Sequence, residues 1–153
     1  MNRSNNWRGK QQGSMLLEGL IAILIFSMGI LAVVGLQAAS IKNTTDAKFR
    51  SDAAFLANKV MAQMWVADDP LGANLAPLFN TGGAGYNAWL PEVQSGLPGA
   101  TGANVPTIVV ARGPVDPAAN TSNNTATVTL AWQAPGDSVA HSYVATGVIA
   151  KQW

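Results

Sequence analysis

The stretch GSMLLEGLIAILIFSMGILAVVGL, residues 13–36, decides the fold of this 153-residue chain. It contains one carboxylate, Glu18, near its start, and no further charged residue follows until Lys42. As an α-helix, the uncharged run from Gly19 to Ile41 would be about 34 Å long, close to the hydrocarbon thickness of a bilayer. The sequence therefore predicts a helix that spans a membrane.

Beyond this run the pattern becomes that of an amphipathic helix, with apolar or small side chains recurring every three or four residues. This stripe consists of Ile41, Thr45, Phe49, Ala53, Leu56, Val60 and Met64. Off the stripe, Asp46 and Arg50 are spaced for an i,i+4 ion pair. We expect one continuous helix, with residues 14–41 in the membrane and residues 42–66 carrying a globular head. Proline disfavours helix in the preceding residue, so Asp68-Asp69-Pro70 is expected to end it.

The remaining residues, 67–153, predict the small head of an α+β protein. Residues 67–106 are rich in glycine and proline and predict a long loop between helix and sheet, with a short helix near Tyr86–Leu90. β-branched residues and alternating patterns then predict an antiparallel sheet of three or four strands. Strands are expected at residues 107–112, 125–132 and 142–151.

The connections in the sheet differ in character. Pro135-Gly136-Asp137 is a turn signal and predicts a hairpin between the last two strands. Gly113–Asn124 is polar and is expected to be an exposed loop. Alternation in the middle strand places Val128, Leu130 and Trp132 on one face, which we expect to be buried.

Composition and charge limit the classes of function. Apolar residues make up 48% of the chain and charged residues only 11%, well below the usual quarter. Because Arg3, Arg8 and Lys10 precede the apolar run, the positive-inside rule places the N-terminus in the cytoplasm and the head on the other side. The head has no basic stripe for nucleic acid. With no cysteine, it must hold together by packing alone.

The sequence gives little support to catalysis. His141 is the single histidine, and without cysteine neither a multi-histidine metal site nor a Cys/His pair can be built. The carboxylates of the head follow turns or loop ends, where such groups usually cap or face water. These carboxylates are Asp68, Asp69, Glu92, Asp116 and Asp137. We therefore expect that the protein is not an enzyme, that it has no catalytic residue, and that it binds no metal and no cofactor.

Glu18 has two interpretations. In an uncut chain it is a charge at a membrane boundary that reaches the headgroups. A cut after Gly13 would instead create a free α-amine on Ser14, one turn away, in a helix that packs against related helices. Opposite charges attract strongly in such a low-dielectric bundle, so Glu18 would pair with the terminal amine of a neighbouring subunit and fix the register.

Gly13-Ser14-Met15-Leu16-Leu17-Glu18 before an apolar helix resembles the class III signal of type IV prepilins and type II secretion pseudopilins. The resemblance implies that prepilin peptidase cuts between Gly13 and Ser14, that Ser14 is methylated, and that Glu18 directs assembly. The implied hydrophobic bundle contains Leu16, Leu17, Leu20, Ile21, Leu24, Phe26 and Leu31.

A second series of residues is similar to the helix of PilV-type minor pilins, and the match covers about residues 9–66. It consists of Gly35–Asn43, Phe49–Ala53, Leu56-Ala57 and Met61–Met64. The resemblance implies a pilin-like fold and a structural role in priming or capping a type IV pilus. Other minor pilins, prepilin peptidase and the inner-membrane bilayer are the implied partners, with the major pilin and a tip adhesin as further candidates. The implied location is the inner membrane before assembly and the pilus afterwards.

Two other assignments remain open. A GspI-type pseudopilin of type II secretion would share the signal and the helix, and a membrane-anchored periplasmic binding domain would keep residues 1–13. Gly29 and Gly35 also leave two possibilities, close packing of neighbouring helices or local loosening of the helix.

Overall fold

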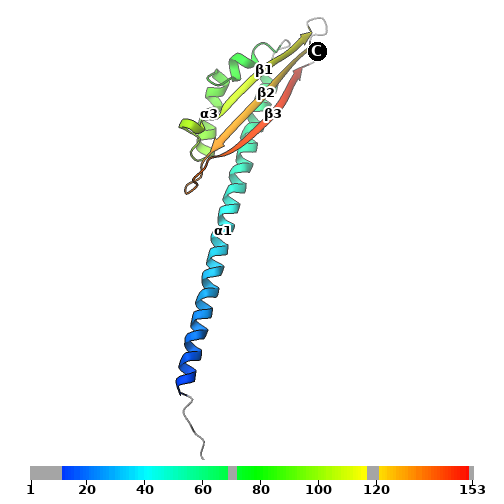
Figure 1. Cartoon of the computed structure of the whole chain (residues 1–153). Helices are drawn as coiled ribbons and strands as arrows, with labels where there is room; N and C mark the ends of the chain where they lie inside the picture. The colour runs from blue at the N-terminus through cyan, green and yellow to red at the C-terminus, as the bar shows by residue number, and fades with distance from the viewer. Residues whose placement is uncertain (1–11, 69–71, 117–120, 152–153) are drawn as a thin grey trace, which may run out of the picture. The chain divides into compact units, whose positions relative to one another are not determined.

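The computed structural model describes residues 12–68, 72–116 and 121–151. Its helices are α1 (Gln12–Ala67), α2 (Leu75–Phe79) and α3 (Ala84–Gly96), followed by the 3-10 turn η1 (Gly102–Asn104) and by strands β1 (Thr107–Asp116), β2 (Thr121–Trp132) and β3 (His141–Lys151) (Figure 1). The chain divides between Thr44 and Thr45 into two compact units. Most of the predicted leader lies outside the described residues, and the expected cut site is in the first turn of α1.

The first unit contains the apolar part of α1, which is continuous through Gly19, Gly29 and Gly35. Hydroxyl groups here bond back to the helix itself: Ser27 donates to the Ile23 carbonyl at 2.7 Å and Thr44 to the Ser40 carbonyl at 2.9 Å. Such bonds satisfy polar side chains without a partner from another element.

The second unit is built on a three-stranded antiparallel sheet in the order β1-β2-β3. Val128, Leu130 and Trp132 of β2 are all buried, as the alternation predicts. The predicted hairpin is also confirmed, with β2 and β3 paired from Trp132 opposite His141 to Ser122 opposite Lys151.

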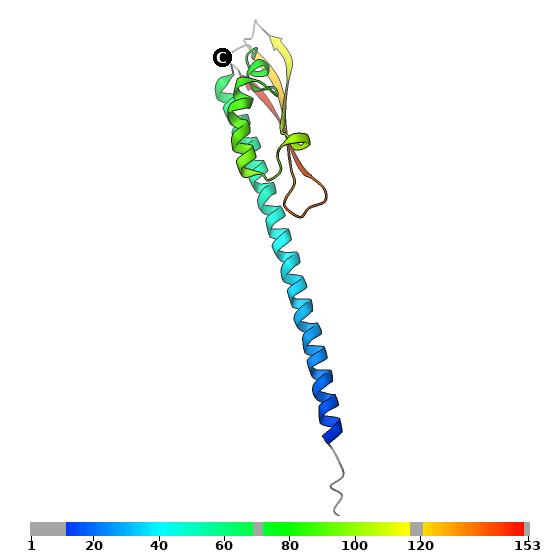
Figure 2. The ribbon, with the colours of Figure 1, turned by 90° about the vertical axis from the view of Figure 1, so that its left-hand side faces the viewer.

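The second part of α1 supplies the other side of the core. In the stripe, side chains from Ala53 onward are buried, whereas Ile41 in the first unit is 68% exposed. The buried members are Ala53, Leu56, Val60 and Met64, joined by Ala57 on an adjacent position. Together with the sheet they confirm the α+β fold, one long N-terminal helix packed on a small antiparallel sheet (Figures 1 and 2).

The region 67–106 is more ordered than predicted, because α2 and α3 lie within it. α3 extends well beyond the short helix expected near Tyr86–Leu90 and contains Pro91. Its buried face consists of Tyr86, Trp89 and Val93, which are spaced by three and four residues. The Trp89 indole donates to the Leu56 carbonyl at 3.2 Å, and this tertiary contact with α1 stabilises the helix. The glycines and prolines of this region had predicted a loop because local pattern does not show such contacts.

The link between α2 and α3 covers the outer edge of β1. The Asn80 side chain accepts a hydrogen bond from the Val110 amide at 2.7 Å, and the Thr81 amide donates to the Ile108 carbonyl at 3.0 Å. These bonds satisfy backbone groups that an open sheet edge would leave unpaired.

The expected exposed loop Gly113–Asn124 is wrong at both ends, because β1 continues to Asp116 and β2 begins at Thr121. The register of the β1–β2 pairing shifts between Arg112 and Val115, and the two strands remain paired beyond this shift. A β-carbon on Gly113 would lie 2.0 Å from the Asn123 carbonyl oxygen, so only glycine fits there. Asn124 is buried rather than exposed, and its amide donates to the Gly72 carbonyl at 3.1 Å.

Tyr86 links α3 to the segment that leads into β1. Its hydroxyl donates to the carbonyl of Pro106 at 2.7 Å, and both residues are buried. Burial raises the pKa of Tyr86 above its ordinary value, because the phenolate would lose its hydration. The folded head therefore holds this proton more tightly than the unfolded chain does.

Tyr86→Phe is expected to lower the free energy of unfolding of the head by about 1–3 kcal/mol at neutral pH, because the buried Pro106 carbonyl loses its donor. The raised pKa also predicts that stability is fully present below about pH 10 and falls as pH rises further, since only the unfolded state then releases the proton. The variant should lose this part of the alkaline dependence. Urea unfolding followed by circular dichroism between pH 7 and 11 measures both effects.

Tyr143→Phe is the matched control, because Tyr143 is half-buried and its hydroxyl makes no hydrogen bond to the described residues. Equal losses in the two variants at neutral pH would contradict the role of the Tyr86 hydrogen bond.

Candidate functional site

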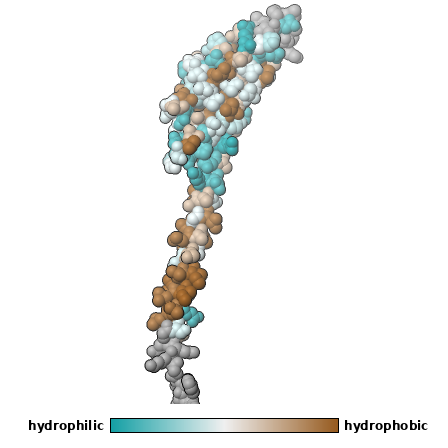
Figure 3. Space-filling view, in the orientation of Figure 1, coloured by the Kyte–Doolittle hydropathy of each residue, from teal (hydrophilic) through white to brown (hydrophobic). Residues whose placement is uncertain are grey.

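The first unit exposes its apolar side chains on every face of the helix. Each large apolar side chain from Met15 to Leu36 is exposed, from 48% at Ile30 to 77% at Leu31. Figure 3 shows hydrophobic residues along this part of α1. An all-apolar helix of this length is long enough to cross a membrane, and it is compatible with a single-pass anchor.

Helix periodicity places most of the predicted bundle residues on one broad face of this helix, with Phe26 on the other side. All are exposed, so this face is left open within the described structure. Their exposed fractions are Leu16 74%, Leu17 61%, Leu20 68%, Ile21 49%, Leu24 63%, Phe26 68% and Leu31 77%.

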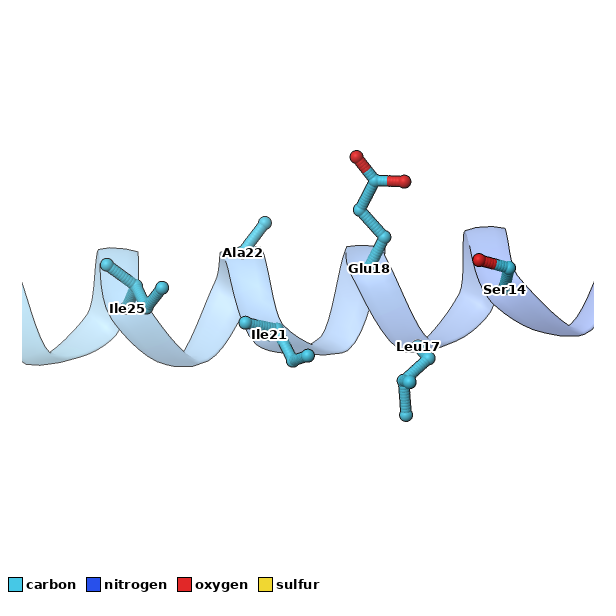
Figure 4. A pocket seen from close by; sticks show the side chains of 6 residues that line it. All are labelled: Ser14, Leu17, Glu18, Ile21, Ala22 and Ile25. Atoms are coloured by element: carbon cyan, nitrogen blue, oxygen red, sulfur yellow. The ribbon is translucent and has the colours of Figure 1, made fainter.

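Glu18 and Ser14 lie one turn apart on the same side of α1. With Leu17, Ile21, Ala22 and Ile25 they line a shallow groove along the helix (Figure 4). The Glu18 carboxylate extends away from the ribbon, and within the described part of the chain it forms no ion pair or hydrogen bond. The arrangement is an apolar surface with one anionic group, which complements a cation on an apolar partner.

Among the described residues, the glycines of the apolar helix have no steric role. A β-carbon on Gly19, Gly29 or Gly35 would meet no atom within 4 Å. Glycine therefore leaves these positions open to close approach by another helix. Because α1 is continuous here, the described structure shows no loosening at Gly29 or Gly35.

The head contains a cluster of ionisable groups that the sequence did not indicate. His141 Nε2 lies 3.1 Å from Asp137 Oδ2, and Asp46 of α1 completes a set of possible metal ligands. The predicted Asp46–Arg50 ion pair does not form within the described structure. The only signal in the sequence was the four-residue spacing of Asp137 and His141, since Asp46 lies far away in the chain.

No family model, curated protein or solved structure matches the chain. Evidence on function comes from the physical chemistry of the two units and from the sequence patterns themselves.

Leu24→Arg is expected to prevent stable membrane integration, because arginine near the middle of a spanning helix costs about 2.5–3.5 kcal/mol on insertion scales. The measurement is the fraction of protein that resists extraction by alkaline carbonate. Ser40→Arg is the control, since Ser40 lies towards the polar end of the span and should tolerate the charge. If Leu24→Arg resists extraction as well as the unmodified chain, the apolar half of α1 does not span the bilayer.

Proposed function

We propose that the chain is a minor pilin of the PilV type, a structural subunit of a bacterial type IV pilus and not an enzyme. The observation that carries the proposal is an apolar helix half, exposed on all faces, with a lone carboxylate at Glu18. The same helix continues into a head of three antiparallel strands. The sequence patterns of residues 13–18 and 35–64 support this assignment over a plain membrane anchor.

In this proposal prepilin peptidase cuts between Gly13 and Ser14 and methylates Ser14. The subunit waits in the inner membrane with its N-terminus in the cytoplasm and its head in the periplasm. It then joins other minor pilins in a complex that primes or caps the fibre. The major pilin and a tip adhesin are further candidate partners of this complex. On leaving the bilayer, the apolar half of α1 exchanges lipid for other apolar helices, so its side chains stay out of water.

Glu18 would give this exchange its register. Burial of an unpaired carboxylate between apolar helices is costly, whereas a nearby cation offsets most of the cost. After the cut, the only fixed cation near this end of the mature helix is the α-amine of Ser14. The amine of a neighbouring subunit that meets Glu18 would fix how far one helix is displaced along the other.

Gly13→Leu is expected to leave the precursor uncut, because a side chain would then occupy the position next to the scissile bond. Mass spectrometry of protein recovered from membranes of the native host measures the cut. The unmodified chain should begin at methylated Ser14, and Ser14→Ala should still be processed. An unmodified chain that begins at Met1 would refute the pilin proposal and favour a membrane-anchored periplasmic domain.

Glu18→Gln and Glu18→Ala are expected to be cut normally yet to enter fibres roughly tenfold less, the factor that corresponds to about 1.4 kcal/mol. Quantitative immunoblots of sheared pili against whole cells measure incorporation. Glu18→Asp keeps the charge and should retain part of the function. Unchanged incorporation of Glu18→Ala would exclude the register role. If the Glu18→Ala cells make normal pili but secrete less protein, the chain belongs instead to a GspI-type pseudopilus.

A further inference from the structure

Three elements of the head place ligand atoms around one point. Asp46 comes from α1, Asp137 from the turn after β2, and His141 is the first residue of β3. The turn is held by two bonds: the Asp137 amide donates to the Ala134 carbonyl at 3.0 Å, and the Gln133 side chain donates to the Asp137 carbonyl at 2.8 Å. Asp137 is therefore positioned by the hairpin itself.

The three side chains are close enough to share one ion. One carboxylate oxygen from each aspartate and one imidazole nitrogen of His141 all lie within 4.8 Å of one another. The Asp137 side chain is only 8% exposed, although the pair with His141 lies at the surface of the head. Two carboxylates this close repel each other, and a bound cation would remove that repulsion.

A cavity at the cluster is also lined by a buried residue whose donor has no partner in the described structure. It is lined by Asp46, Arg50, Trp132 and His141, together with Ala47 and Ser142. Trp132 is 3% exposed, and within the described structure its indole N–H has no hydrogen-bond acceptor. The indole also stacks on the imidazole, with ring centroids 5.9 Å apart. An unpaired buried donor on a residue that lines the cavity can bond to an oxygen ligand of a metal, either water or a carboxylate.

The ligand set selects the class of ion. Calcium and magnesium prefer oxygen ligands alone, whereas imidazole with carboxylates suits zinc and related divalent transition metals. Three protein ligands and one open position complete a tetrahedral site. His141 Nε2 offers its lone pair when the imidazole proton is on Nδ1, so a proton on Nε2 moves there or is released to water on binding.

We propose that Asp46, Asp137 and His141 bind one Zn²⁺ ion, with an oxygen ligand in the remaining position that accepts a hydrogen bond from Trp132. The ion ties the β2–β3 turn to α1 and takes the place that a disulfide would have in a head without cysteine. The site is a property of the head and does not depend on the proposed function.

The test is calorimetric titration of the full chain in detergent micelles with ZnCl2, using a tag without histidine. We expect one Zn²⁺ per chain, little heat from CaCl2, and a rise of several degrees in the melting temperature of the head. Asp46→Asn, Asp137→Asn and His141→Gln should each lower Zn²⁺ affinity more than tenfold, the lower end of what even outer-shell changes cost.

Two matched variants separate a metal site from general charge effects. Asp52→Asn changes another half-buried aspartate of α1 and should leave Zn²⁺ affinity unchanged. Arg50→Gln removes a positive charge from the cavity and should raise the affinity roughly twofold to tenfold. A loss of affinity in Arg50→Gln would indicate an anion site and overturn the proposal.

The unmodified chain gives a readout that does not depend on the folding of variants. It has a single histidine, so ¹⁵N-histidine labelling yields the signals of one imidazole. Zn²⁺ should shift these signals at one equivalent and leave a single tautomer with the proton on Nδ1. If the signals do not move, or if His141→Gln binds Zn²⁺ as well as the unmodified chain, the proposed site does not exist.

Discussion

Within the described structure, no other element of the chain covers the first part of α1. Its large apolar side chains from Met15 to Leu36 are all about half exposed or more. At about 1.5–3 kcal/mol for each such side chain, transfer from water to an apolar surrounding would gain on the order of tens of kcal/mol, more than the usual stability of a whole small domain. This part of the helix therefore favours an apolar surrounding, either lipid or other apolar helices. The proposed function supplies both, first the inner membrane and then the fibre.

The two units of the chain use one helix for different purposes. From Gln12 to Thr44, the part of the first unit that the structure describes, the helix has no core of its own, whereas from Ala53 onward a stripe of α1 is buried against the sheet. Backbone hydrogen bonds continue through both units because every intrahelical bond is local. Only the side chains change, and they change the surrounding that each part needs.

Carboxylates in the two units are handled by different physical means. Glu18 lies at the edge of an apolar surface and would need a cation from another molecule if helices pack around it. Asp137 and Asp46 lie in the head beside His141, where a cation from solution would neutralise them. For Glu18 the proposed cation belongs to a neighbouring subunit, whereas for Asp46 and Asp137 it would bind within one subunit.

The sequence alone determined the features that follow from local pattern. The long apolar helix follows from composition, and the helix stripe from Ala53 to Met64 and the buried face of β2 follow from the periodicity of neighbouring residues; the structure confirms these three elements. The candidate pair Ser14 and Glu18 also follows from sequence, since four residues of helix place both on one side. Its function stays a proposal.

The tertiary structure decided what depends on contacts between distant segments. α3 forms despite Pro91 because Trp89 packs against α1, and the strands extend into the polar stretch 113–124 because Gly113 lets β1 approach β2. The Asp46–Asp137–His141 cluster joins residues that are far apart in the chain, and folding brings them within 4.8 Å. Local pattern carries no information on such distances, because the sheet and the helix fix them only after they pack.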